Sequence, residues 1–413
     1  MWNYLLGKSI FVPNITSAEI DKQLEPVLRG MEEMGIKLDI EEFAKLESKL
    51  SANRQRLTAN IFQLAGFEFN LDSPSQMAEV LFDKLRLPQA GLKRTKSGVS
   101  TAASELKKII DQHQIIAPIL KYRELSKLIS TYLMPLPKMV DKNNRLHTHY
   151  SQDVSTGRLA SSNPNLQNIP IKGEWGEEIR KSFIADIGKV LIAADYSQIE
   201  LRIVACLAED KAMIESFKSG RDIHTDTAAD IFKKKPEEIS KDERRFAKTI
   251  NFGVLYGMSS YGLSQSLNIG QDTAAEYIRR YKEVYSGIND YCKRMIDFAK
   301  KNGYVETLFG FRRELPEISS YNRFTAETNQ RMAINSPVQG TAAEILKLSM
   351  LELYRKFNIQ DTRNKTQTNS KKLAANTYNL KHGEAKLLLT VHDELVVEAP
   401  EEEANKVADI IKE

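Results

Sequence analysis

Apolar residues at helical spacing dominate this chain, and only a few short apolar runs interrupt them. The spacing begins at Ala18, breaks at Gly35 and resumes near Glu41. Helical spacing is found over residues 18–34, 41–65, 103–130, 198–300 and 325–357. A chain with this pattern is predicted to be a mostly helical α+β protein in which strands are few and short.

The short apolar runs predict the strands. We expect strands over His147–Val154, and Val190–Ala194 forms an apolar run that ends directly in Asp195. Two further runs, Leu387–Val391 and Leu395–Val397, flank a predicted three-residue turn, His392-Asp393-Glu394. Strand ends and hairpin turns hold side chains rigidly, so Asp195 and Asp393 occupy positions suited to a precise site.

Composition excludes several classes of protein. The 413 residues allow two or three domains, and 41% hydrophobic residues are enough for a normal core. No apolar run approaches the roughly 18 residues that cross a bilayer, and no secretory signal opens the chain. Cys206 and Cys292 are too few for a disulfide framework, so we expect a cytoplasmic protein with no membrane partner. The net charge of +4 is weak support for a nucleic-acid partner.

Asp195 and Asp393 are the candidate metal ligands. Mg²⁺ takes oxygen ligands and prefers one or two carboxylates together with substrate phosphates. Two such ions about 3.5–4 Å apart activate an attacking hydroxyl and neutralise a leaving group. On spacing alone the alternative is stronger, because an aspartate at a strand end usually serves as a cap or turn residue.

A second pattern lies in the helical stretch from Arg244 to Gly257. Arg244, Lys248, Phe252 and Tyr256 recur every four positions and form one stripe about 18 Å long. Two cations followed by two aromatic rings match a triphosphate followed by a sugar and base. An ordinary amphipathic helix with basic outer residues is the alternative.

Three polar segments complete the set. The loop Thr156–Pro170 offers glycine, arginine, serine and amide groups that bind phosphates and minor-groove acceptors. A basic loop contains Lys93, Arg94 and Lys96, and residues 361–384 form a polar insertion. Each of these three segments can also be explained as solvent-exposed surface with no binding role. For the insertion, a mobile surface segment is the simpler interpretation.

Together these segments closely resemble the family A DNA polymerases, the group that contains the large fragment of bacterial DNA polymerase I. Asp195-Tyr196-Ser197-Gln198-Ile199-Glu200-Leu201-Arg202 is similar to motif A of that family. Arg244 to Gly257 resembles motif B, and Val391-His392-Asp393-Glu394 resembles motif C. The resemblance covers about residues 24–410.

The resemblance implies a role for individual residues. Asp195 and Asp393 would bind two Mg²⁺ ions, for which Mn²⁺ could substitute, and Glu394 would support them. Lys248 would act as a catalytic cation that protonates pyrophosphate. The implied contacts to the incoming dNTP are Arg244, Lys248, Phe252, Tyr256, His224, Glu200, Gln198 and Lys172. The implied contacts to primer-template DNA are Arg158, Asn335, Gln339, Arg331, His392, Lys93, Arg94 and Lys96.

The same resemblance implies a right-hand architecture, with an antiparallel palm sheet, helical fingers and a helical thumb. The expected parts are a lead-in at 1–22, the thumb and its base at 23–140, the palm at 141–205 and 325–413, and the fingers at 206–324. Only about 22 residues precede the family's opening helix, so we expect no proofreading exonuclease. We also expect a monomer. A bacterial or phage origin fits best, and an organellar one stays open.

Two other functions compete with a DNA polymerase. A single-subunit RNA polymerase needs space for the ribose 2′-hydroxyl, which Glu200 would fill. A non-catalytic DNA-binding subunit is the other, although such a protein usually loses one of Asp195, Asp393, Lys248 and Arg244. Preference for dNTPs or rNTPs on a primed template distinguishes a DNA polymerase from an RNA polymerase. Primer extension by an Asp393 variant distinguishes a DNA polymerase from a non-catalytic subunit.

Overall fold

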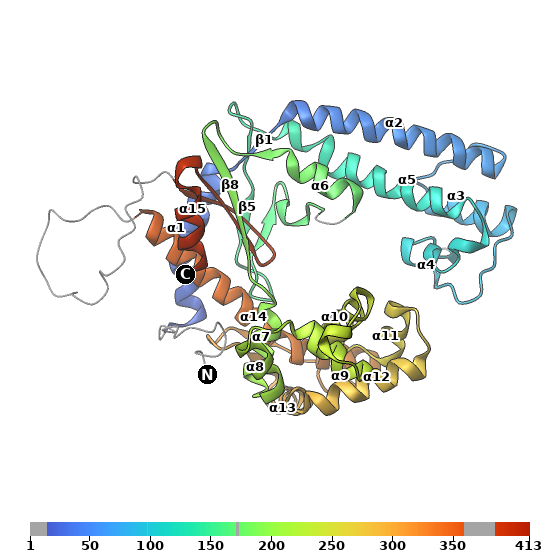
Figure 1. Cartoon of the computed structure of the whole chain (residues 1–413). Helices are drawn as coiled ribbons and strands as arrows, with labels where there is room; N and C mark the ends of the chain where they lie inside the picture. The colour runs from blue at the N-terminus through green and yellow to red at the C-terminus, as the bar shows by residue number, and fades with distance from the viewer. Residues whose placement is uncertain (1–14, 97, 171–172, 359–384) are drawn as a thin grey trace, which may run out of the picture. The chain divides into compact units, whose positions relative to one another are not determined.

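The computed structural model describes residues 15–96, 98–170, 173–358 and 385–413. These residues form an α+β protein that divides into two compact units (Figure 1). Unit 1 comprises Met1–Glu32, Tyr150–Ser162 and Leu191–Glu413, and unit 2 comprises Glu33–His149 and Asn163–Val190. In the described part of the chain, no helix combines the length and apolar composition that crossing a bilayer requires.

Unit 2 consists of two long helices, several short ones and two small sheets. Its elements are β1 (Ile36–Leu38), α2 (Ile40–Ala65), α3 (Pro74–Ala78), β2 (Arg94–Thr95), β3 (Gly98–Val99), α4 (Ala103–Lys107), α5 (Ile116–Leu128), β4 (Arg145–Leu146), α6 (Glu174–Lys181) and β7 (Phe183–Ile184).

The long helix α2 has a clear start and end in its sequence. Asp39 caps it by accepting a hydrogen bond from the Glu42 amide at 3.0 Å. Gly66 ends it at φ 83°, a left-handed conformation that glycine adopts without steric cost. Helices α2 and α5 lie side by side (Figure 1), and their apolar faces meet α3 and α4 in the core of this unit.

A three-stranded antiparallel sheet, ordered β4-β1-β7, closes the other end of unit 2. Asp186 joins its strands, because it lies 3.0 Å from the Lys37 ammonium and 3.3 Å from the Arg145 guanidinium. Both cations hold the pKa of Asp186 below its ordinary value, the Lys37 hydrogen bond contributing most.

Unit 1 holds most of the helices. Its elements are α1 (Ser17–Met34), β5 (His149–Ser151), β6 (Ala160–Ser162), β8 (Lys189–Asp195), α7 (Ile199–Leu207), α8 (Lys211–Lys218), α9 (Ile223–Phe232), α10 (Lys241–Leu255), α11 (Ser260–Leu267), α12 (Gln271–Val284), α13 (Ser286–Asn302), β9 (Tyr304–Glu306), β10 (Arg312–Glu314), α14 (Arg323–Asn358), β11 (Lys386–Val391), β12 (Glu394–Pro400) and α15 (Ala404–Lys412).

The main sheet of unit 1 has the order β11-β12-β8. Strands β11 and β12 form an antiparallel hairpin in which Val391 pairs with Glu394, so its turn contains only His392 and Asp393. The buried residues of β11 and β12 are mostly apolar, apart from Thr390 and Glu398, and with α1, α7 and α14 they form the central hydrophobic core. Strand β8 is only partly buried. Strand β8 thus brings its last residue, Asp195, to the sheet that also holds the hairpin.

Helix α14 carries two buried charged residues through this core. Glu344 and Lys347 are 1% and 2% exposed. The Glu344 carboxylate accepts a hydrogen bond from the Thr307 hydroxyl at 2.8 Å, and the Lys347 ammonium donates to Asp21 on α1 at 2.7 Å. Gly340 allows this close approach, because a Cβ there would lie 2.5 Å from Thr307 Cγ2. These polar contacts fix α14 against α1 and the β9–β10 hairpin.

The predicted helix at 103–130 is wrong as one element. It divides into α4 and α5, with a short 3₁₀ turn at Ile110–Gln112 between them. Pro118 favours a helix start here, because it lies in the first turn of α5, where its missing amide hydrogen breaks no helical hydrogen bond. The apolar spacing concealed this signal.

Other expectations need smaller corrections. The strand predicted over 147–154 is limited to β5, since the chain turns where the Gly157 amide donates to the Val154 carbonyl. The expected irregular lead-in at 1–22 already contains the start of α1 at Ser17, and the three-residue turn has two residues. The basic loop at Lys93–Lys96 includes strand β2. The polar insertion at 361–384 and Lys172 lie outside the described residues.

We expect Glu344 to make stability pH-dependent. Burial raises its pKa to about 7, although hydrogen bonds from Thr307 and Ser17 and the charge of Lys347 oppose this, while Asp21 adds to it. Because the folded-state pKa lies above the ordinary 4.5, the stability that Glu344 contributes is fully present below about pH 4.5 and is lost as the pH rises to about 7, by up to about 3 kcal/mol.

The substitution Glu344→Gln should remove this loss, because the amide oxygen still accepts from Thr307 but carries no charge. Thermal unfolding at pH 5.5 and 8.5 measures it, with exposed Glu352→Gln on the same helix as the matched control. Equal pH dependence in the wild type and Glu344→Gln would contradict a buried, proton-binding Glu344.

Candidate active site

Asp195 and Asp393 come together at the end of the unit 1 sheet. Asp195 is the last residue of β8, and Asp393 lies in the β11–β12 turn. The backbone amide of Tyr196 donates to the carbonyl oxygen of Asp393 at 3.4 Å, which joins the two segments next to both carboxylates. Burial raises the pKa of Asp195, and the negative charge of Asp393 raises it further. The two side chains are therefore close enough to repel each other.

This repulsion fits a cation site. Within the described ranges, no three histidine, cysteine, aspartate or glutamate side chains gather in a way that could hold a metal ion alone. Mg²⁺ does not need such a cage, because it binds through one or two carboxylates and completes its shell with water and phosphate oxygens. Asp195 and Asp393 supply that donor set. Glu394 begins β12 beside them.

The turn that carries Asp393 has an unusual backbone. His392 adopts φ 55°, in the left-handed region that non-glycine residues seldom occupy. Two-residue hairpins require such a conformation to match the twist of their strands. The exposed His392 side chain is thereby held in a defined place, at a conformational cost on the order of 1 kcal/mol.

Glu200 and Arg158 form an ion pair beside the carboxylates. Helix α7 begins after Gln198, which has φ 58°, and places Glu200 in its buried first turn. Arg158 Nη2 lies 2.5 Å from Glu200 Oε1. Burial raises the pKa of Glu200, the charge of Arg158 lowers it and Asp393 raises it again. The sequence did not predict that these two residues are partners.

The stripe on α10 is present as predicted from its spacing. Ser240 and Glu243 cap the helix reciprocally, Arg244 and Lys248 are exposed, and the aromatic pair is half-buried. The rings of Phe252 and Tyr256 stack with centroids 6.3 Å apart, and Tyr256 caps the helix at its C-terminal end.

Arg244 is oriented by a partner that sequence reasoning missed. Its Nε and Nη2 atoms donate to the two carboxylate oxygens of Asp222 at 3.1 and 2.7 Å. Asp222 also caps α9 by accepting from the Thr225 amide. These hydrogen bonds, above all the one from Arg244, outweigh burial and lower the pKa of Asp222 to about 2. Aspartate before a helical stretch is an N-cap signal, so this role could have been found.

His224 lies one residue into α9 and is 2% exposed. Its ring centroid is 5.9 Å from that of Phe252, and its Nδ1 atom lies 3.0 Å from Asn251 Nδ2. Burial lowers the pKa of His224 to about 4, and Arg244 and Lys248 lower it as well, whereas Asp222 opposes them. The imidazole is therefore neutral at physiological pH.

Helix α14 presents three of the predicted DNA-contact residues at intervals of four. Arg331 donates to the Thr328 hydroxyl at 2.9 Å and lies against Gly257, where a Cβ would be 3.0 Å from Arg331 Cγ. The side-chain oxygen of Asn335 is buried and accepts no hydrogen bond from the described residues. Gln339 follows one turn later and is half-buried.

The predicted basic residues of unit 2 are exposed. Lys93, Arg94 and Lys96 lie on or beside β2, and Arg94 Nη2 donates to the Gln89 side chain at 3.2 Å. They belong to unit 2, whereas Asp195 and Asp393 belong to unit 1.

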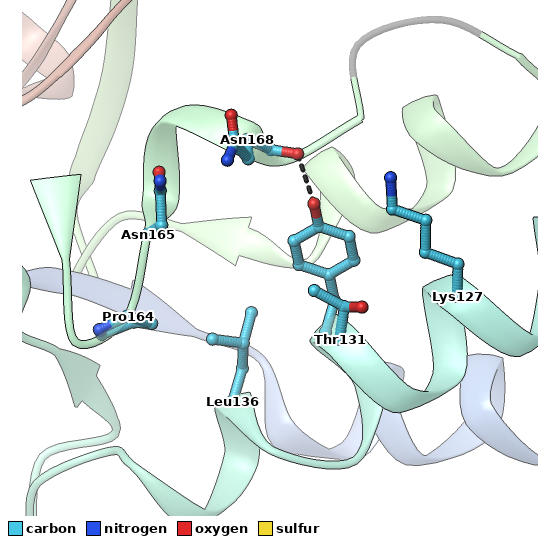
Figure 2. A pocket seen from close by; sticks show the side chains of 7 residues that line it. Lys127, Thr131, Leu136, Pro164, Asn165 and Asn168 are labelled. Atoms are coloured by element: carbon cyan, nitrogen blue, oxygen red, sulfur yellow. Dashed lines mark hydrogen bonds between the residues drawn. The ribbon is translucent and has the colours of Figure 1, made fainter. Parts of the chain in front are cut away.

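A cavity of about 390 Å³ in unit 2 was not predicted (Figure 2). The Tyr132 hydroxyl donates to the backbone carbonyl of Asn168, which anchors the loop to the helical segment that follows Lys127. The cavity is lined by Lys127, Thr131, Tyr132, Leu136, Pro164, Asn165 and Asn168. Asn165 and Asn168 belong to the loop Thr156–Pro170, which the sequence indicated as a candidate binding loop. The opposite wall of the cavity comes from a distant segment, Lys127 to Leu136.

Comparison with known proteins finds relatives over almost the whole chain. The chain is 43% identical over 397 residues to a thermostable DNA polymerase I of Thermus caldophilus, covering 96% of this chain and 45% of that protein. It is 42% identical over 398 residues to DNA polymerase I of Geobacillus stearothermophilus, covering 96% of this chain and 43% of the relative. The chain thus spans less than half the length of these curated relatives.

A solved structure is similar over nearly the whole chain. It is the POL domain of Pol1 from M. smegmatis in complex with DNA primer-template and dNTP. The TM-score is 0.85 at 34% identity, covering 95% of this chain and 65% of the other. Residues 40–413 match the family described as DNA polymerase family A. The chain therefore belongs to DNA polymerase family A.

Proposed function

We propose that this chain is a DNA-directed DNA polymerase that adds deoxynucleotides to a primer 3′-hydroxyl and releases pyrophosphate. The observation that carries the proposal is the meeting of Asp195 and Asp393, from distant parts of the sequence, at the end of one sheet. The POL domain from M. smegmatis was solved with primer-template and dNTP, which supports the same partners here.

Asp195 and Asp393 would hold two Mg²⁺ ions, and Mn²⁺ has the ligand preference to replace them. Ions bound there would activate the 3′-hydroxyl and neutralise charge on the departing pyrophosphate. Glu394 would support this pair from the first position of β12. His392, held by its strained turn, would lie near the primer terminus.

The charged face of α10 would bind the triphosphate. Lys248 is exposed on that face and would contact the phosphates and donate a proton to pyrophosphate. Arg244 keeps an exposed guanidinium edge while Asp222 fixes its direction, so it would meet the phosphates in one orientation. His224 would add a neutral donor, and Lys172 would add a further cation.

The aromatic end of α10 would position the base and sugar. Phe252 would stack beside the incoming nucleotide, and Tyr256 would occupy the template-base position until the site closes. Glu200, buried and fixed by Arg158, would occupy the space of a ribose 2′-hydroxyl, with Gln198 next to it. This feature favours deoxynucleotides over ribonucleotides and argues against an RNA polymerase.

Duplex DNA would be bound by residues of both units. Arg158, Asn335 and Gln339 would contact minor-groove acceptors that all correct base pairs share, and Arg331 would lie near the template-primer. Lys93, Arg94 and Lys96 would bind backbone phosphates. The unit 2 cavity around Lys127 offers an ammonium and two amides to the same backbone. In this proposal residues 23–140 are the thumb and its base, 206–324 the fingers, and 141–205 with 325–413 the palm.

Replacing Asp393 tests the catalytic proposal. We expect Asp393→Ala to abolish primer extension while leaving primer-template affinity within about threefold, because the metal site serves chemistry more than DNA binding. Extension assays and fluorescence anisotropy measure the two effects, with thermal unfolding as a check of folding. Asp409→Ala, an exposed aspartate on α15, is the matched control. Extension by Asp393→Ala at the wild-type rate would contradict the proposal.

Replacing Glu200 separates its size from its charge. We expect Glu200→Ala to raise ribonucleotide incorporation relative to deoxynucleotide by at least about tenfold, which corresponds to about 1.4 kcal/mol. Glu200→Gln keeps the volume and should keep the discrimination within about threefold. Single-nucleotide incorporation of dNTP and rNTP on one primed template provides the ratios. Equal loss of discrimination in both variants would show that charge, and not space, excludes the ribose.

A further inference from the structure

A buried chain of hydrogen bonds leads from the His224 ring into the core of unit 1. Asn251 Nδ2 lies 3.0 Å from His224 Nδ1 and 3.0 Å from Thr227 Oγ1. The Tyr285 hydroxyl lies 3.0 Å from the same Thr227 oxygen. Asn251 and Thr227 are both 0% exposed, so water cannot replace any of these bonds. Neither residue has a part in the function proposed above.

The single hydroxyl hydrogen of Thr227 determines the direction of this chain. Thr227 Oγ1 lies 2.7 Å from the Ile223 carbonyl, which can only accept, so the hydrogen is used there. The threonine oxygen must then accept from its other neighbours. The Asn251 amide nitrogen, Nδ2, lies 3.0 Å from Thr227 Oγ1, whereas the amide oxygen, Oδ1, lies 3.2 Å from it. The nearer atom is therefore the nitrogen, which donates to Thr227.

The same amide nitrogen has a second hydrogen, and His224 Nδ1 is its other neighbour. A ring nitrogen that accepts a hydrogen bond carries no proton, so the proton of the neutral imidazole resides on Nε2. Asn251 comes from α10 and His224 from α9, which means that the contact also fixes the ring between the two helices.

We propose that Asn251, supported by Thr227, is a positioning residue that holds His224 as the neutral Nε2–H tautomer, a fixed hydrogen-bond donor for the triphosphate. The donor role rests on the proposed function, whereas the tautomer and the orientation of the ring do not.

The surroundings favour a neutral donor here. The charged and titratable groups that face His224 are Asp222 from its own helix end, Arg244 and Lys248 from α10, and Tyr285 beyond Thr227. Burial disfavours a charge on the ring, and two cations already lie near it, so the pKa of His224 falls to about 4. A neutral N–H donor keeps the same strength from about pH 6 to 9.

Nitrogen-15 NMR of histidine-labelled protein tests the tautomer directly. The chain has six histidines, and His224→Gln assigns the resonance. We expect His224 to show a protonated Nε2 and an unprotonated Nδ1 from pH 6 to 8, with a pKa below about 5. A protonated Nδ1, or titration near the unperturbed value of about 6.5, would overturn the proposal.

Substitutions along this chain of hydrogen bonds distinguish a positioning role of Asn251 and Thr227 from a merely structural one. Asn251→Asp replaces the donor by an acceptor of the same shape, so the proton should move to Nδ1 and the pKa of His224 should rise by at least about one unit. Thr227→Val removes the hydroxyl and should produce a mixture of tautomers. Thr227→Ser retains the hydroxyl and is the matched control. An unchanged His224 spectrum in both Asn251→Asp and Thr227→Val would contradict a positioning role.

Kinetics then distinguish this inference from the proposed function. We expect Asn251→Asp to raise KM for dNTP about tenfold at pH 8 and to introduce a pH dependence between 6 and 8 that the wild type lacks. His224→Gln keeps an amide donor and should lose less than His224→Phe. If KM is unchanged in Asn251→Asp and His224→Phe, the triphosphate contact is wrong, whatever the tautomer is. If KM changes but the NMR shows a protonated Nδ1, the positioning inference is wrong.

Discussion

The candidate site depends on one interaction, the placement of β8 beside the β11–β12 hairpin. Sheet order β11-β12-β8 and the bond from the Tyr196 amide to the Asp393 carbonyl bring two carboxylates together that would repel in the absence of a cation. The buried apolar residues of β11, β12 and α14 hold this arrangement against the repulsion. The structure thus stores an unfavourable contact that a divalent ion would relieve, which is a common property of functional sites.

Several polar groups of unit 1 are held by a partner within the same unit. Arg244 is paired with Asp222, Arg158 with Glu200, and His224 is neutral beside Asn251. Each polar group therefore has a fixed direction before any substrate arrives, which reduces the reorganisation that binding would require. Lys248 is exposed on the face of α10 that also carries Arg244. Preorganisation of this kind is what a reaction dominated by electrostatics and positioning needs.

Sequence reasoning succeeded where local pattern determines structure. The strand ending in Asp195, the hairpin around Asp393 and the helical stripe from Arg244 to Tyr256 follow from apolar spacing, and all three are found. It failed where partners come from distant segments. Neither the Arg158–Glu200 pair nor the Asn251 contact to His224 has a local signature, because each joins elements that only tertiary packing brings together. The break before α5 was missed for another reason, since apolar spacing outweighed Pro118.

The most direct test of the central claim is to count divalent ions. Mn²⁺ titration followed by electron paramagnetic resonance can be carried out on the chain with dNTP and a primer that lacks the 3′-hydroxyl. The account predicts two bound ions per complex in the wild type, and fewer ions or clearly weaker binding in Asp195→Asn and Asp393→Asn. The same number of ions bound with the same affinity in all three proteins would contradict it.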